Sequence, residues 1–262
     1  MRPQLPVFHT LGTSLILGIP IALAQPGGGV ALTSDYVFRG ASQTGGEPAI
    51  QGHFFYEIRF TASETVDEVT GEVGAETRSA FYADVWASNV DFNEGADDPG
   101  ITDEADLELD LTAGFYNTTR FDLSYDVGGV RYIFPDSDAD LNYNEYFLKL
   151  AYPLGEMANI KGELWFSNDI YATDENGYYV QLGADYFFPQ EIFLDAHLGY
   201  TTFDEDVYGE DYPDNYWDWR VAISREFFGI NLELAYTDTN GNGSQLFEDA
   251  GARGVFTLSR EF

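Results

Sequence analysis

Cysteine is absent from the 262-residue chain, and methionine occurs only twice. The lack of cysteine excludes disulfide bonds, zinc–thiolate centres and cysteine nucleophiles. Basic residues are also scarce, because 12 Lys and Arg stand against 45 Asp and Glu and leave a formal net charge of −33. Binding nucleic-acid phosphate needs clustered basic side chains, so the composition argues against a nucleic-acid partner. The same excess of negative charge attracts cations and repels anions.

Long apolar runs are missing beyond the N-terminus, so the rest of the chain has no candidate transmembrane helix. At the N-terminus, Arg2 precedes an apolar stretch from Leu11 to Leu23, which ends in the small-x-small pattern Ala22-Leu23-Ala24. This pattern is typical of a secretory signal peptide. We expect cleavage after Ala24, which divides the chain into a signal peptide, residues 1–24, and one mature domain, residues 25–262. Pro20 and the short apolar length disfavour a membrane anchor.

The mature chain is rich in aromatic residues, with 18 Tyr and 21 Phe, and its hydrophobicity alternates with a period of two. From Leu107 to Phe115, apolar residues at odd positions alternate with Glu108, Asp110 and small residues. A strand sends alternate side chains to opposite faces, so each such segment has one apolar face and one polar face. Twelve segments of this kind are expected near 30–38, 48–60, 79–90, 105–116, 119–134, 142–152, 159–168, 177–187, 190–203, 216–227, 229–237 and 250–262.

The connectors alternate in length, which favours a membrane barrel over a soluble sandwich. Short connectors at 117–118, 153–158, 188–190 and 228–229 alternate with long acidic stretches at 91–104, 135–141, 169–176, 204–215 and 238–249. Outer-membrane barrels combine short periplasmic turns with longer external loops. The segment 61–78 is a long connector where a short turn is expected, and it is interpreted as an insertion or an extended hairpin.

Aromatic residues at the strand ends support the same fold. Tyr178 and Tyr186 share one face and are eight residues apart, about 27 Å along a strand at ~3.4 Å per residue. After strand tilt this matches the apolar band of about 25 Å that aromatic girdles border in such barrels. The chain ends at Phe262, on the same parity as Phe256 and Leu258, which resembles the signal read by the barrel assembly machinery.

Together these patterns predict an all-β protein: a closed antiparallel transmembrane β-barrel of about 12 strands in up-and-down order. Strand numbers of ten or fourteen stay open. In hydrocarbon only helices or closed sheets satisfy the backbone, and this chain lacks the helices. The alternatives are a secreted soluble β-sandwich that binds carbohydrate and a plugged barrel with a structural or adhesive role.

The segment Leu32–Gly52, LTSDYVFRGASQTGGEPAIQG, is similar to the N-terminal signature of the TorF-type porin family. Weaker similarities follow at 86–92, 108–115, 124–135, 142–152, 232–239 and 255–262, so the resemblance covers nearly all of the mature chain. It implies an outer-membrane β-barrel with a transport role, and it supplies no catalytic or substrate residues. Asp35 and Arg39 lie in the signature, where they pair across the first strand or hold the first loop.

Polar residues on the inner parity are predicted to line the lumen, either as a cation-favouring pore or as structural ion pairs that fill a narrow barrel. They are Glu57, Arg59, Glu108, Asp110, Lys149, Gln181, Asp185, Asp195, His197, Asp218, Arg220 and Glu233.

A calcium-loop pattern occurs near the C-terminus, and its residues are Asp238, Asn240, Asn242 and Asp249. Because flanking helices are not expected, an ordinary hairpin loop is the favoured interpretation. No cofactor is expected. His53 and His197 are the mature histidines, and no nucleophile motif accompanies them, so the sequence predicts no enzyme. The expected function is passive passage of small solutes or cations across the bacterial outer membrane, with membrane lipid and the assembly machinery as partners.

Overall fold

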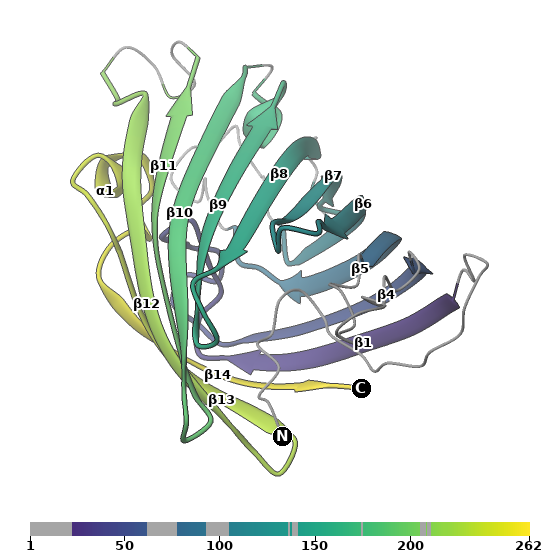
Figure 1. Ribbon diagram of the computed structural model, residues 1–262. Helices are drawn as coiled ribbons and strands as arrows, with labels where there is room; N and C mark the ends of the chain where they lie inside the picture. The colour runs from purple at the N-terminus through teal and green to yellow at the C-terminus, as the bar shows by residue number, and fades with distance from the viewer. Residues whose placement is uncertain are drawn as a thin grey trace, which may run out of the picture.

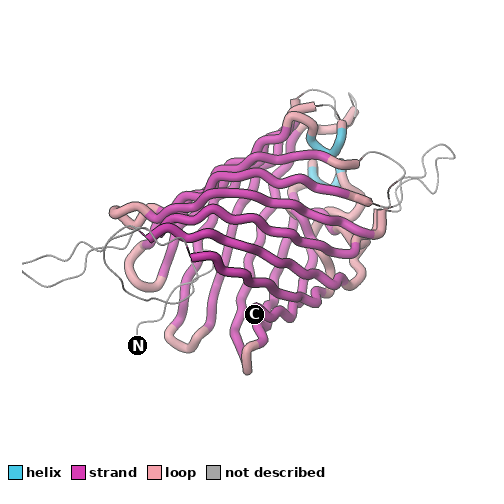
Figure 2. The backbone as a smooth tube through the Cα atoms, turned by 90° about the vertical axis from the view of Figure 1, so that its right-hand side faces the viewer, coloured by secondary structure: helices cyan, strands magenta, loops and turns pink. Residues whose placement is uncertain are grey.

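The computed structural model describes residues 23–61, 78–92, 105–135, 137, 141–173, 175–204, 208 and 211–262. In this part of the chain, twelve antiparallel strands close into one barrel, seen from two sides in Figures 1 and 2. The strands are β1 (Leu23–Thr33), β4 (Ala49–Thr61), β5 (Arg78–Asn89), β6 (Leu107–Thr118), β7 (Ser124–Ile133), β8 (Tyr143–Pro153), β9 (Ala158–Ser167), β10 (Gly177–Phe188), β11 (Ile192–Phe203), β12 (Asn215–Phe227), β13 (Ile230–Thr239) and β14 (Arg253–Glu261).

Each barrel strand pairs with the next barrel strand along the chain, and the last strand closes the ring against the first. At this seam β14 pairs with β1 from Gly29↔Glu261 to Thr33↔Thr257. Phe262 and Gly28 then exchange two backbone hydrogen bonds of 2.9 and 3.1 Å. Closure leaves no open sheet edge, which is the condition for strands in hydrocarbon. The prediction of a closed up-and-down barrel of twelve strands is confirmed.

Apolar side chains cover the outer surface of the barrel. Leu182 on β10 is 68% exposed and Ile50 on β4 is 70% exposed, and similar side chains occupy the outer parity of every strand between them. The two-sheet sandwich considered from the sequence is therefore wrong, because the apolar face does not pack against a second sheet. None of the described helices is long and apolar enough to cross a membrane.

Aromatic rings form contacts on the outer surface near both ends of the strands. At one end, the Phe166 and Tyr178 ring centroids lie 5.3 Å apart. At the other end, Phe81 contacts Phe60 at 5.7 Å and Phe115 at 4.8 Å. Tyr178 and Tyr186, at the two ends of β10, both face outward, 40% and 39% exposed. The expected spacing of aromatic residues along β10 is thus found on the outer face.

The two ends of the barrel differ in their connections, as Figure 2 shows. Short turns at 119–123, 154–157, 189–191 and 228–229 join strands at one end, called here the turn end. Longer connections join strands at the opposite, loop end. They include the 3-10 helix η1 (Ile170–Ala172) and the short helix α1 (Gly243–Leu246). The predicted insertion at 61–78 starts at the turn end, but its residues 62–77 lie outside the described residues.

The N-terminal region departs from the sequence-based expectation. The first strand spans Leu23–Thr33 rather than 30–38, so it begins two residues before the predicted cleavage after Ala24. Residues 1–22 lie outside the described residues, and the signal peptide stays a prediction. Residues 34–48, called here the inner loop, leave the wall and carry the two-residue strands β2 (Val37–Phe38) and β3 (Ala41–Ser42). The apolar alternation at 34–38 was misleading because both faces of this segment find partners inside the barrel.

Candidate functional site in the barrel lumen

The inner loop crosses the lumen at the loop end. Tyr36 contacts Trp86 of β5 with ring centroids 5.3 Å apart, and Phe38 contacts Tyr132 of β7 at 6.1 Å. Val37, between them in sequence, packs against a small buried cluster on β12, β13 and β14. Neighbouring residues of the loop therefore reach opposite walls, and the loop fills the space between them.

A buried ion pair fastens the tip of the inner loop to β8. The Arg39 guanidinium donates through Nη1 to Glu145 Oε1 at 2.9 Å and through Nη2 to Oε2 at 2.8 Å. The Tyr132 hydroxyl donates to the same carboxylate at 2.9 Å. The guanidinium also lies 4.2 Å from the Tyr179 ring centroid and 5.6 Å from that of Trp165. The paired side chains are only 5% and 1% exposed, so each charge depends on the other for compensation.

Electrostatics favour the charged form of Arg39 in this position. Burial alone would lower the pKa of the Arg39 guanidinium, but the Glu145 carboxylate together with Tyr171 and Tyr132 outweighs burial, and the pKa is raised above its ordinary value. Arg39 therefore stays charged in the lumen.

The base of the inner loop is fastened by Asp35. Its carboxylate accepts from Arg253 of β14 at 2.8 Å, from Ser42 at 2.5 Å and from Thr44 at 3.1 Å. Gly40, at the tip, has φ +83°, and a Cβ there would stand 2.4 Å from a Thr239 methyl. Only glycine fits this position without displacing the wall. Asp35 and Arg39 thus each contact a different barrel strand, β14 and β8, and the role considered for them in holding the first loop stays a prediction.

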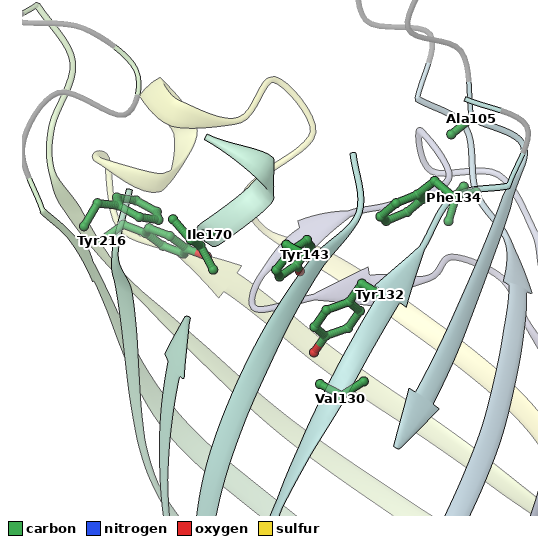
Figure 3. Packing of buried hydrophobic residues seen from close by; sticks show 9 residues of the cluster. Ala105, Val130, Tyr132, Phe134, Tyr143, Ile170 and Tyr216 are labelled. Atoms are coloured by element: carbon green, nitrogen blue, oxygen red, sulfur yellow. The ribbon is translucent and has the colours of Figure 1, made fainter. Parts of the chain in front are cut away.

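Aromatic and aliphatic side chains pack around the inner loop, as Figure 3 shows for the loop end. Tyr132 and Tyr143 stack with centroids 4.5 Å apart, and Tyr143 meets Tyr171 of η1 at 5.5 Å. Burial next to Glu108 raises the pKa of the Tyr36 hydroxyl well above its ordinary value, which keeps it a neutral donor. The buried members of this cluster, called here the loop-end core, are Val90, Ala105, Val130, Tyr132, Phe134, Tyr143, Ile170, Phe203 and Tyr216.

The twelve residues predicted to line the lumen all lie on the inner parity of their strands, but their charges are arranged unevenly. The inner face of β9 to β13 is called here the paired wall. On it, the Lys161 ammonium lies 2.5 Å from the Asp195 carboxylate and 3.2 Å from the Asp185 carboxylate. Arg220 on the same wall pairs with Asp195 and Glu233. Lys161 and Arg220 thus pair with Asp185, Asp195 and Glu233. Among the described residues, Glu163 and Asp218 of the same wall have no Lys or Arg within ion-pairing distance. Their role in permeation stays a prediction.

Carboxylates on β5, β6 and β7 are partnered differently. This group, called here the acidic wall, is Asp84, Glu108, Asp110 and Asp126. Among the described residues no Lys or Arg lies within ion-pairing distance of any of them, although Lys149 acts on Asp126 at longer range. Tyr82 donates to Asp126 at 3.0 Å. Among the described residues, one buried oxygen each of Glu108 and Asp110 has no hydrogen-bond partner. The acidic wall is therefore a group of carboxylates without a close base, of which Asp84 and Asp126 face the open lumen.

A cavity of about 250 Å³ lies beside the acidic wall. It sits on the turn side of the inner loop, because Trp86 contacts the loop whereas Asp84 and Tyr82 of the same strand line the cavity. On β8, Glu145 holds the loop, and Lys149, four residues further toward the turn end, also lines the cavity. The lining residues are His53, Phe55, Glu57, Tyr82, Asp84, Thr112, Tyr116, Asp126 and Lys149.

The model of the Gcw_chp family, bacterial proteins of unknown function, matches residues 24–61 and 58–261 of the chain. The chain belongs to the Gcw_chp family. No curated protein matches it. The expected TorF-type porin family is a finer assignment than this match provides.

Solved structures are similar to this Gcw_chp protein at low sequence identity. The structure of the NanC porin is 6% identical with a TM-score of 0.52, over 91% of this chain and 99% of that one. A structure from work on in-meso crystallization of membrane proteins is 11% identical, with a TM-score of 0.51 over 90% and 83%. An outer membrane channel from Pseudomonas putida F1 is 12% identical, with a TM-score of 0.46 over 97% and 100%. At such identities the first two matches establish the barrel fold alone.

The residues of the calcium-loop pattern take part in local hydrogen bonds of this Gcw_chp barrel. Asn240 accepts from the backbone of Trp217 at 3.0 Å, and Asn242 donates to the carbonyl of Asn215 at 2.9 Å. Asp238 accepts from the Tyr236 hydroxyl at 2.9 Å, and the backbone carbonyl of Asp249 accepts from Ser42 at 3.0 Å. The described residues contain no group of three His, Cys, Asp or Glu arranged to hold a metal ion. A hairpin loop remains the favoured interpretation of this segment, and a calcium site remains the untested alternative.

Sequence reasoning missed Glu145, Asp84 and Asp126, all on inner parity. The alternation along β5, β7 and β8 carried enough signal to place them inside the barrel. It could not show that Glu145 is the partner of Arg39, because the two residues are 106 positions apart. His197 Nε2, on β11, lies 3.5 Å from Asp218 Oδ1 of β12.

Proposed function

We propose that this protein is a porin-like channel of the bacterial outer membrane, narrowed by its own inner loop, that passes small solutes and favours cations. The observation that carries the proposal is a closed barrel with an apolar exterior and a charged interior, crossed by a loop fastened to the far wall. An apolar exterior suits lipid, and an interior with charged walls suits water and ions. The proposed role is transport rather than catalysis.

The preference for cations follows from the two walls. On the paired wall, Lys161 and Arg220 offset their neighbouring carboxylates. Asp84 and Asp126 of the acidic wall line the open cavity without such close partners, so a cation moving past them is stabilised and an anion is repelled. Rings of uncompensated carboxylates are a recognised means of cation selection in pores.

The proposed location follows from the outer surface and the chain ends. An exposed apolar belt is stable next to lipid, and the predicted signal peptide would deliver the chain to the envelope. Phe262, 77% exposed at the barrel seam, is available for recognition by the barrel assembly machinery. The resemblance of Leu32–Gly52 to TorF-type porins supports the same assignment, with outer-membrane lipid and small cations as partners.

Recording current through the purified protein in planar bilayers tests the proposal. We expect discrete conductance steps in KCl and, across a KCl gradient, a reversal potential of the sign that potassium permeation produces. Empty bilayers and a mock purification are the controls. If no conductance steps occur at several salt concentrations and voltages, the native protein is not an open pore. If chloride carries the current, the cation preference is wrong but the pore is supported.

A second candidate function is a plugged barrel with a structural or adhesive role. The loop-end core favours it, because Tyr216 and Ile170 are each 1% exposed at the level where a pore would have to pass. A channel that is blocked only by its loop should pass ionic current once the loop is released. A permanently filled barrel should pass no current in either state. The Arg39 substitution in the Discussion separates these candidates.

A further inference from the structure

We propose that the cavity on the turn side of the inner loop binds a small organic cation, namely a protonated amine with a short apolar body. This names the solute class of the proposed channel. It rests on that function only for how the solute reaches the cavity, since equilibrium binding requires the site and not a current.

The carboxylates of the cavity supply the charge that an ammonium group needs. Asp84, Asp126 and Glu57 all line it. The Tyr82 hydroxyl donates to both oxygens of Asp126, at 3.0 and 3.2 Å, and Tyr116 donates to Glu57 at 2.9 Å. These bonds fix the carboxylates in place but leave acceptor capacity, because an ionised carboxylate has about four lone-pair sites.

Asp84 is the carboxylate best suited to meet the ligand. Its described partner is His53, whose Nδ1 lies 3.4 Å from Asp84 Oδ2. The other ring nitrogen of His53 lies 3.0 Å from Glu261, so the ring is held between two carboxylates. A single long contact leaves most of the hydrogen-bonding capacity of Asp84 for an N–H donor that enters the cavity.

The bases beside the cavity do not cancel this charge. Arg59 is paired with Glu57. Lys149 lines the cavity, but its ammonium lies 4.6 Å from the Phe147 ring centroid and 4.9 Å from that of Trp165, which partly satisfies its charge. Lys149 also acts on Asp126 at longer range. Three carboxylates against these two bases still leave one negative charge at the cavity, with His53 counted as neutral. An anionic ligand would have to approach both Asp84 and Asp126.

Aromatic rings in the same wall suit an organic body rather than a bare metal ion. Tyr82 and Tyr116 lie with centroids 6.3 Å apart, and Phe55 stacks on His53 at 6.0 Å. The Tyr82 ring lies against Gly114, where a Cβ would come within 2.7 Å of the ring, so glycine keeps the ring against the wall and the cavity open. Rings of this kind bind both apolar groups and ammonium charge. The described residues offer no three-ligand metal group.

The size of the cavity limits the ligand. Its volume of about 250 Å³ corresponds to roughly eight waters at ~30 Å³ each. A single-ring or short-chain amine fits such a space, whereas an oligosaccharide or peptide does not. Benzylamine is a suitable probe because benzyl alcohol and benzoate match its shape while removing or reversing its charge.

Titration calorimetry of the purified, detergent-solubilised barrel tests the proposal. We expect benzylamine to bind, and benzyl alcohol and benzoate to bind more weakly. Asp84→Asn should weaken benzylamine binding by roughly 10- to 100-fold, the scale of a hydrogen bond to a charged partner. Asp195→Asn is the matched control, because Asp195 is an inner carboxylate outside the cavity, and it should leave the affinity unchanged. Heat-modifiable gel mobility verifies that each variant is folded.

Three results would overturn the proposal: equal binding of the three probes, no binding of benzylamine, or equal losses in Asp84→Asn and Asp195→Asn. The wild-type comparison of probes holds even if a variant fails to fold. Binding without any conductance would support the site and contradict the channel. Conductance without binding would contradict the site and support the channel.

Discussion

Replacing Arg39 with alanine is expected to release the inner loop and open the lumen at the loop end. The substitution removes the bidentate partner of Glu145 and the guanidinium that contacts Tyr179. Glu145 would then be an uncompensated charge, 1% exposed, in the loop-end core. Breaking one side of a buried pair costs ~3–5 kcal/mol, so the balance between docked and released loop shifts by roughly 10²- to 10⁴-fold.

Single-channel recording and limited proteolysis measure this release. We expect a larger conductance in Arg39→Ala than in wild type and new cleavage within residues 34–48 by protease added to whole cells. Arg220→Ala is the matched control, because it also removes an inner arginine that pairs with carboxylates, Asp195 and Glu233, but away from the loop. Unchanged conductance and protection in Arg39→Ala would show that the ion pair does not hold the loop. Silence in both wild type and Arg39→Ala would favour the permanently plugged barrel.

Placing an arginine on the outer surface at Leu182 is expected to prevent stable assembly. Leu182 lies midway along β10, faces outward and is 68% exposed. If that surface meets lipid, a charge at the midplane costs ~2–4 kcal/mol, a large part of a typical folding free energy. On a surface that meets water, the same change would cost almost nothing.

Heat-modifiable gel mobility of the membrane fraction, with urea titration of the purified barrel, measures this effect. We expect Leu182→Arg to lose the fast-migrating folded form and Leu182→Ala to keep most of it. Gln181→Arg is a second control, because Gln181 is adjacent to Leu182 but faces inward and donates to Glu163. We expect Gln181→Arg to keep the folded form, since the new charge would lie beside the Glu163 carboxylate. Equal stability of Leu182→Arg and Leu182→Ala would mean that the outer face is not in contact with lipid.

The wall of the barrel was predictable from the sequence because each strand carries its own alternation of apolar and polar residues. A strand with lipid on one side and a polar lumen on the other must alternate at every residue, and β6 and β10 both do so. The turns at 154–157 and 228–229 were also found close to their expected places. Closure then follows, since an even number of such strands in a membrane cannot leave an edge.

The interior was not predictable to the same degree because its contacts are remote in sequence. The inner loop looked like part of the first strand, since Tyr36 and Phe38 continue an alternating pattern. Only the three-dimensional ring brings Arg39 to Glu145 and Asp35 to Arg253, which are 106 and 218 positions apart. The cavity has the same origin, because its lining comes from five different strands. Parity indicates which residues face inward, but not which of them meet.

The seam between β1 and β14 couples the closure of the barrel to the packing of the inner loop. Arg253 of β14 donates to the Asp35 carboxylate, and the Thr257 hydroxyl of β14 donates to that of Thr33 at 3.0 Å. The last barrel strand, β14, therefore completes the base of the inner loop. The contacts that hold this base form only when the ring is joined, whereas the Arg39–Glu145 contact at the tip of the loop does not involve the seam.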